Sequence, residues 1–176
     1  EYTTNVDEKA GRASVVFEIV EAPKIKIKDV VFENAEVFKQ RKLRKTVKTR
    51  RFWFLSFVTG SGTLKDDQLV EDREKLIDLY HNAGHLDFKI NDVTSETVSD
   101  KRMVVHFDLD EGKTYRVGQV SFVGNTLFSS DEILRGVHTE GTLKRPTMLS
   151  GEVFSPKGLS ADVNAIQDFY GSRGYI

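Results

Sequence analysis

The 176-residue sequence contains no cysteine, which excludes disulfides, thiolate zinc sites and a cysteine nucleophile. It also lacks an excess of charge, since 26 Lys and Arg residues face 27 Asp and Glu residues and the net charge is −1. This balance provides no global attraction to nucleic acid or to an anionic membrane, so any such attraction must be local. No apolar run approaches the roughly 18–20 residues that span a bilayer as a helix.

What is present suffices for a folded protein. Hydrophobic residues make up 39% of the chain and charged residues 30%, so it can bury a core. Its length suits one domain or two small ones. The chain opens with neither a methionine nor a basic-then-apolar signal peptide, so we expect a fragment of a longer mature protein.

The sequence matches itself when it is shifted by 90 positions, without a gap. It therefore divides into the tail of one unit (1–24, the leading segment), a complete unit (25–114) and the front of another (115–176, the last unit). We expect the last unit to stop before its final strands. The matched pairs are Val30 and Val120, Phe32 and Phe122, Phe38 and Phe128, Leu69 and Leu159, Asp72 and Asp162, Tyr80 and Tyr170, and Gly84 and Gly174.

Within the complete unit, the pattern predicts the order strand, helix, helix, strand, strand. Apolar and charged residues alternate in "IKIKDVVFEN", which indicates a half-buried strand. A short helix is predicted around 40–48 and a longer one over 66–83, with Gly84 as the left-handed residue that ends it. Strands over 86–94 and 103–110, separated by the polar "SETVSDK", close the unit.

Two helix starts are visible in the last unit. Ser129 and Glu132 have the spacing of a capping box. Ser155 stands where an N-cap would precede Pro156 at the first helical position. The sequence therefore predicts helices that begin directly after Ser129 and Ser155.

Three motifs of the repeat resemble those of a known family: the turn "FVGN" (122–125), the strand exit "DEGK" (110–113), and a helix pattern. With the βααββ order they resemble the POTRA domains of the Omp85 family, over essentially the whole chain. The complete unit departs from the family at its first turn, where "ENAE" (33–36) replaces the glycine-asparagine pair. The helix pattern consists of Leu69, Asp72, Leu76, Tyr80 and Gly84.

The resemblance implies an α+β fold of tandem POTRA domains, each with a three-stranded mixed sheet covered by two helices. The long insert between the two helices of the complete unit, "RRFWFLSFVTGSGTL" (50–64, the aromatic insert), resembles the aromatic-then-glycine insert of a third POTRA domain. We therefore expect the C-terminal strands of the second domain in 1–24, the third domain in 25–114 and the truncated fourth in 115–176.

The resemblance also implies a function. It places the chain in the periplasmic part of an outer-membrane protein that binds unfolded outer-membrane β-barrel proteins and accessory lipoproteins, near its own C-terminal barrel. It implies no enzyme activity, no cofactor and no nucleic acid partner. The alternatives are another Omp85 member, such as a secretion-partner transporter, and a POTRA-containing scaffold protein that only docks partners.

The resemblance points to one strand as a binding site, because the second strand of a POTRA unit lies at a sheet edge. A free edge offers unpaired N–H and C=O groups to an incoming chain. The alternative is an edge that is merely tolerated and blunted by its charges. The predicted edge strand consists of Leu86, Asp87, Phe88, Lys89, Ile90, Asn91, Asp92, Val93 and Thr94.

The aromatic insert is the second candidate site. It joins two helices, so its side chains either fold back over the unit or form an exposed patch for a partner or a membrane. The basic run before it (39–51) carries eight Lys or Arg residues and suits a solvated helix face, a membrane or partner contact, or nucleic acid. The candidate contact residues are Arg51, Phe52, Trp53, Phe54, Leu55 and Phe57.

Catalytic and metal-binding patterns are weak. His81 and His85 have the spacing of a metal pair on a helix, but Gly84 should end the helix between them, so a solvated helix end is the alternative. His106 and His138 suit structural or surface positions. The "GSG" of the insert lacks the lysine and the helix of a phosphate loop. We therefore expect no catalytic and no metal site.

Overall fold

The computed structural model describes residues 2–7, 12–17, 25–52, 56, 62–140 and 150–175. In the leading segment, β1 (Tyr2–Asp7) and β2 (Arg12–Phe17) pair antiparallel in a two-stranded sheet of their own. None of the helices in the described ranges is long and apolar enough to cross a membrane.

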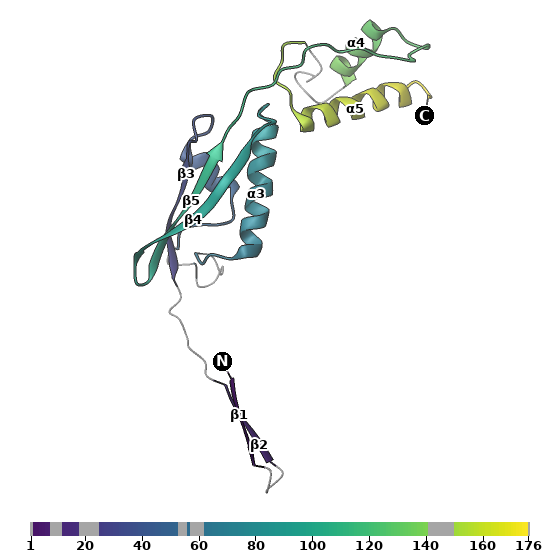
Figure 1. The fold of residues 1–176 in the computed structure, drawn as a ribbon. Helices are drawn as coiled ribbons and strands as arrows, with labels where there is room; N and C mark the ends of the chain where they lie inside the picture. Colours follow the sequence, from purple (N-terminus) through teal and green to yellow (C-terminus); the bar gives the residue numbers. More distant parts are fainter. Residues whose placement is uncertain are drawn as a thin grey trace.

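The complete unit folds as a three-stranded sheet with two helices (Figure 1). β3 (Lys26–Glu33) and β4 (Lys89–Ser99) flank β5 (Arg102–Asp110), so the last strand of the unit is the central one. β3 pairs with β5 in parallel and β4 pairs with it antiparallel, which makes the sheet mixed. The α+β class and the βααββ order predicted from the sequence are confirmed. The helices are α1 (Gln40–Thr46) and α3 (Asp66–His81).

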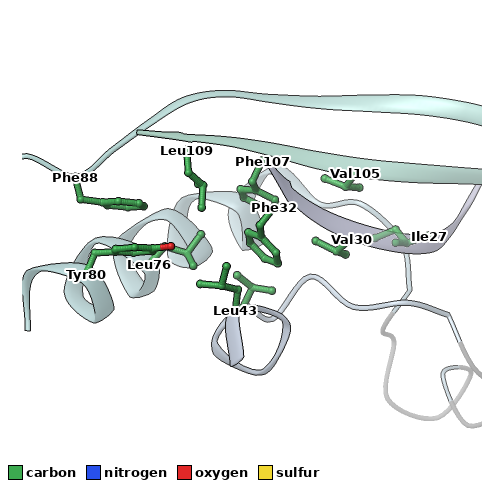
Figure 2. Close-up of a cluster of buried hydrophobic side chains, with 11 residues drawn as sticks. Ile27, Val30, Phe32, Leu43, Leu76, Tyr80, Phe88, Val105, Phe107 and Leu109 are labelled. Carbon is green, nitrogen blue, oxygen red and sulfur yellow. The ribbon is translucent and has the colours of Figure 1, made fainter. Parts of the chain in front are cut away.

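The core lies between the sheet and the two helices (Figure 2). Phe32 of β3 stacks on Phe107 of β5 with 5.1 Å between ring centroids, and Tyr80 of α3 stacks on Phe88 at 3.9 Å. Each large apolar side chain buried in this way contributes about 1.5–3 kcal/mol. The buried set is Ile27, Val30, Phe32, Leu43, Val47, Leu76, Tyr80, Phe88, Val105, Phe107 and Leu109.

The strand predicted over 86–94 is wrong at both ends. Its first three residues instead form a turn after α3, closed by a 3.2 Å bond from the Phe88 N–H to the carbonyl of His85. At the other end, the polar stretch predicted as a separator pairs with β5 up to Ser99, which leaves two residues for the hairpin turn. The strand continues there because an edge strand exposed on both faces requires no apolar alternation.

The last unit contains α4 (Ser130–Glu140) and α5 (Pro156–Gly171), which meet in a small buried cluster of Ile133, Ala165 and Phe169. The segment equivalent to β3, residues 116–123, forms no ladder within the described part of the chain and makes only an isolated antiparallel bridge between Arg116 and Val153. In the complete unit the equivalent residues form β3 and pair with β5.

The sequence signals for helix ends are confirmed. Gly84 follows α3 with φ +87°. The Ser155 hydroxyl accepts a bond from the Gly158 N–H at the start of α5. Ser129 and Glu132 exchange the two bonds of a capping box. The hydroxyl of Ser129, and then its N–H, donate to the Glu132 carboxylate and hold the pKa of that carboxyl below its usual value.

Both units make their first turn in the same way, although their sequences differ there. Gly124 of "FVGN" has φ +81°, and Asn34, at the equivalent place in "ENAE", has φ +57°. Asn is the residue other than glycine that most readily adopts this left-handed conformation. The departure from the family pattern therefore preserves the backbone turn.

Candidate functional site

β4 forms one edge of the sheet, since it pairs with β5 on one side and with no other described strand. The N–H of Val93 donates to the carboxylate of Asp92 at 2.7 Å, so Val93 points its main-chain groups away from β5. Because orientation alternates along an antiparallel strand, Ser95 and Thr97 point outward as well. Their outward groups have no partner among the described residues. The second half of β4, Thr94–Ser99, is therefore an open edge.

The two halves of β4 differ in burial. Ile90 and Val93 are half-buried and pack against the core, whereas every residue from Thr94 to Ser99 is exposed. The side chains of Lys89 and Asn91 reach the carboxylates of β5, at 3.9 Å and 3.2 Å. The first half thus anchors the strand, and the second half projects into solvent as a place for pairing.

Three residues of the predicted edge strand serve other purposes. Phe88 belongs to the core through its stack on Tyr80. The carboxylate of Asp87 accepts a 2.8 Å bond from the hydroxyl of Tyr115, and Leu86 is half-buried in the same turn. The edge therefore consists of Lys89–Ser99 and excludes residues 86–88.

The aromatic insert is described only at its base. The Phe52 N–H donates to the carbonyl of Ile27 at 2.8 Å, and the ammonium of Lys26 lies 3.9 Å from the centre of the Phe52 ring. Arg51 is exposed beside it, and these residues line a polar pocket with Lys28. Trp53, Phe54, Leu55 and Phe57 lie outside the described residues.

Asp72, one residue of the helix pattern named above, has a structural role. It is fully buried on α3, and its carboxylate accepts the backbone N–H groups of Lys48 and Thr49, the latter at 2.8 Å. These N–H groups belong to the chain that leaves α1, so Asp72 ties the two helices together. Asp162, its equivalent in the last unit, is also fully buried.

Glu111, in the strand exit "DEGK", is a structural residue that the sequence did not reveal. Its carboxylate accepts the N–H groups of Glu36 and Val37 at 3.0–3.1 Å and the hydroxyl of Tyr80 at 2.7 Å. Burial, followed by the hydrogen bond from Glu111, raises the pKa of Tyr80 well above its usual value. The acidic residue at a strand exit was the available signal, but its partners lie 31 and about 75 positions away along the chain.

The histidines occupy structural positions. His85 is buried, its Nδ1 lies 2.9 Å from the carbonyl of Glu111, and its Nε2 lies 3.2 Å from the Thr114 hydroxyl. His106 lies on the sheet with Nδ1 2.8 Å from Glu33. The side chain of His138 lies outside what the structure describes. Within the described residues, no group of three potential metal ligands gathers.

The end of α3 meets the start of α5. The side-chain oxygen of Asn82 accepts the Ser155 hydroxyl at 3.1 Å and the Lys157 N–H at 2.9 Å. The carbonyl of Gly84 accepts the N–H of Tyr115 at 2.7 Å. These contacts join the complete unit to the last unit through main-chain and short polar groups.

Gly84 is required at this junction, and Gly84→Ala is expected to cost about 2–3 kcal/mol of unfolding free energy. A Cβ at this position would lie 2.6 Å from Val153 Cγ1 and 3.0 Å from the carbonyl of Tyr115, on a backbone with φ +87°. Urea unfolding and exchange of the Tyr115 amide measure the effect. Gly171→Ala is the matched control, because a Cβ there meets no atom within 4 Å. Equal stability of the two variants would contradict this account.

Two stretches of the chain, residues 25–112 and 115–176, match the family model POTRA, described as surface antigen variable number repeat. The outer membrane protein assembly factor BamA of Neisseria meningitidis serogroup B is 29% identical over 166 residues, which cover 94% of this chain and 20% of that protein. A putative outer membrane protein assembly factor of Treponema pallidum is 27% identical over 173 residues, covering 95% of this chain and 19% of that protein.

Among solved structures, POTRA domains 3–5 of Haemophilus influenzae BamA align with a TM-score of 0.51 and 18% identity, over 85% of this chain and 56% of that one. This similarity concerns the fold alone. The chain spans about a fifth of the length of the curated relatives named above.

Proposed function

The chain belongs to the POTRA family, and from this membership we propose that its complete unit captures unfolded outer-membrane β-barrel proteins by adding their extended segments to β4. The observation that carries the proposal is the open half of β4, Thr94–Ser99, which is exposed on both faces at a sheet edge. Main-chain pairing does not depend on side-chain identity. One such edge can therefore accept many different strand sequences.

The names of two relatives support outer-membrane protein assembly as the process in which this capture takes place. Two proteins that match almost the whole chain are named outer membrane protein assembly factors, one of them as putative. On this proposal the chain is the periplasmic POTRA region of an Omp85 protein, with domains at 25–114 and 115–176 after the end of a preceding one. Accessory lipoproteins and the protein's own C-terminal barrel are the further partners, and pairing and barrel folding supply the free energy.

The aromatic insert is proposed as a separate partner contact. Its base at Phe52 adjoins the start of β3, at the sheet edge opposite β4. A partner held there would leave β4 free for a captured strand. The exposed guanidinium of Arg51 beside Phe52 would suit an acidic group on that partner.

Capture is tested by titrating the chain with a ten-residue peptide from an outer-membrane β-strand and following the backbone amides by NMR. We expect the largest shifts in Thr94–Ser99. Ser95→Pro is expected to weaken binding about tenfold, because proline removes one outward N–H group and is tolerated at an edge strand.

Ser95→Ala is the matched control, since it keeps that N–H group and should bind like the unaltered chain. Silence of the β4 amides up to millimolar peptide would refute capture. Equal binding by the proline and alanine variants would refute the assignment to this edge.

A further inference from the structure

β3 forms the opposite edge of the same sheet, and its outward main-chain groups are already bonded. The residues of β3 that face away from β5 are Ile27, Val30 and Phe32. Each of the three has both its N–H and its C=O paired, either with a side chain or with a main-chain group of the insert. An incoming strand would find no free donor or acceptor at these positions.

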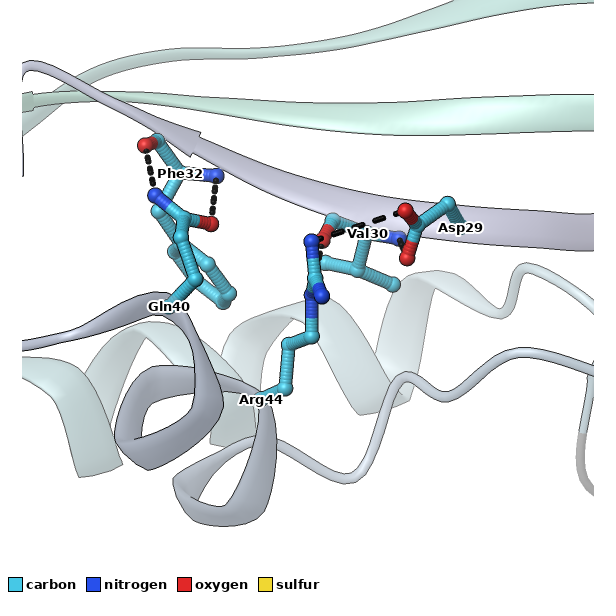
Figure 3. A network of polar contacts seen from close by, with 5 residues as sticks. All are labelled: Asp29, Val30, Phe32, Gln40 and Arg44. Atoms are coloured by element: carbon cyan, nitrogen blue, oxygen red, sulfur yellow. Dashed lines mark hydrogen bonds and ion pairs between the residues drawn. The ribbon is translucent and has the colours of Figure 1, made fainter.

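Gln40 closes the end of the β3 edge nearest the first turn (Figure 3). Its side-chain oxygen accepts the Phe32 N–H at 3.1 Å, and its side-chain nitrogen donates to the Phe32 carbonyl at 2.5 Å. A primary amide offers one acceptor and two donors, so it can reproduce the pair of bonds that a strand residue would make. Gln40 thus occupies one pairing position of an added strand.

Arg44 and Asp29 close the middle of the edge (Figure 3). The Nε of Arg44 donates to the carbonyl of Val30 at 2.7 Å, and the carboxylate of Asp29 accepts the Val30 N–H at 2.9 Å. A 3.5 Å contact between the two charged groups connects them. Charged partners make stronger hydrogen bonds than neutral ones, so displacing them would be costly.

The base of the insert closes the remaining position. The N–H of Ile27 donates to the carbonyl of Gly62, and the carbonyl of Ile27 accepts the N–H of Phe52, both at 2.8 Å. Gly62 has φ +86°, and a Cβ there would lie 2.6 Å from the Cα of Phe52. The two ends of the insert therefore approach closely and present main-chain groups to β3.

Residue spacing on α1 produces this closure. Gln40 and Arg44 are four positions apart and lie on one side of the helix, whereas Leu43 between them is fully buried in the core. Packing of Leu43 sets the rotation of α1 and thereby aims the two polar side chains at β3. The open edge differs. Among the described residues of β4, the only bond to an outward main-chain group is the one that the Val93 N–H donates to the neighbouring Asp92 carboxylate.

We propose that Gln40 and Arg44 determine which edge of the complete unit receives a strand, by closing β3 and leaving β4 as the acceptor. This proposal rests on the proposed function, because it assumes strand capture. It assigns the choice between the two sheet edges to two residues of α1. Removal of both side chains should expose the main-chain groups of Val30 and Phe32 and create a second acceptor edge.

The test uses the full 176-residue chain, the same strand peptide and amide shifts by NMR, with Gln40→Ala/Arg44→Ala compared to the unaltered chain. We expect new peptide-dependent shifts in β3, around Val30 and Phe32, in addition to those in β4. Arg41→Ala is the matched control: it removes one charge from an exposed position of α1 that makes no described contact with β3. It should respond like the unaltered chain.

The outcomes separate the two proposals. Shifts confined to β4 in the folded double variant would overturn edge selection and leave capture intact. Shifts in β3 of the double variant, with none in β4 of any chain, would support closure by Gln40 and Arg44 and overturn capture at β4. Silence at both edges in every chain would overturn both proposals.

A second variant covers the case in which the double variant fails to fold. Gln40→Met keeps the length of the side chain and removes both bonds to Phe32. We expect the Phe32 amide to exchange with solvent about tenfold faster in this variant while core amides are unchanged. An unaltered Phe32 exchange rate would overturn the role of Gln40.

Discussion

Replacement of Asp72 by alanine is expected to lower the unfolding free energy of the complete unit by about 4 kcal/mol. The carboxylate is fully buried and accepts the N–H groups of Lys48 and Thr49. Each buried donor left without a partner costs about 1–3 kcal/mol, and the lost side chain also leaves a gap between the helices. A loss of this size is a large fraction of the 5–15 kcal/mol that stabilises a typical domain.

Urea unfolding measures this loss when it is followed at the amides of Val105 and Phe107, because these residues report on the complete unit alone. Asp78→Ala is the matched control on the same helix, at an exposed position where the structure shows no side-chain hydrogen bond or ion pair. Asp72→Asn should fall between the two, since an amide oxygen can accept one of the two bonds. A loss below about 1 kcal/mol for Asp72→Ala would show that water replaces the carboxylate.

Local signals made most of the fold predictable. Alternation in "IKIKDVVFEN" indicated β3. The buried residues Ile27, Val30 and Phe32 keep a period of two except at the register shift between Ile27 and Asp29. The ends of α3 and α5 follow from Gly84 and Ser155, whose roles depend only on their own backbone and neighbours. Each of these features is written in about ten consecutive residues, which is why sequence reasoning finds it.

The edge strand was harder, for a physical reason. From Thr94 onward β4 contacts the core with neither face, so its residues carry no period of two. What makes this stretch a strand is its pairing with β5 through the hairpin, and pairing leaves little trace in composition. The strand was therefore predicted to end where its apolar alternation ends, five residues early.

The residues that control the edges were hidden for a related reason. Gln40 and Arg44 belong to a basic run that was interpreted mainly as a solvated helix face, with a membrane or partner contact and nucleic acid as the alternatives. Their contacts reach 8 and 14 positions back to β3, and only the packing of Leu43 aims them there. The amino-acid type alone does not show whether a polar side chain bonds to the main chain of a strand edge or faces solvent.

The two edges together make the complete unit asymmetric. β3 is closed by Gln40, Arg44 and the base of the insert, whereas the outer half of β4 remains open. Unprotected edges promote association between copies of a protein, so closing one edge lowers that hazard. On the proposed function, the asymmetry would give a captured strand a single place on the sheet.

Replacement of Glu111 by alanine is expected to cost about 3 kcal/mol. This carboxylate joins the turn after β3, at Glu36 and Val37, to the Tyr80 hydroxyl of α3. Loss of the acceptor leaves a fully buried phenol unpaired, which alone costs about 1–3 kcal/mol, and frees the turn. Glu36→Ala is the matched control, since it removes a nearby exposed carboxylate and keeps its own N–H group. Urea unfolding at the amides of the core distinguishes the two variants.

The pH dependence of stability separates the role of Glu111 from simple packing. Burial and Glu111 raise the pKa of Tyr80, so the folded state holds the neutral phenol while the unfolded state ionises near pH 10. The stabilising effect is therefore complete below about pH 10 and declines as the pH rises further. Glu111→Gln keeps the length of the side chain and removes its charge, so burial alone still raises the pKa and the decline should end at a lower pH, with a smaller total loss of stability. A decline that continues to the same pH as in the unaltered chain would mean that Glu111 positions the turn without influencing the pKa of the phenol.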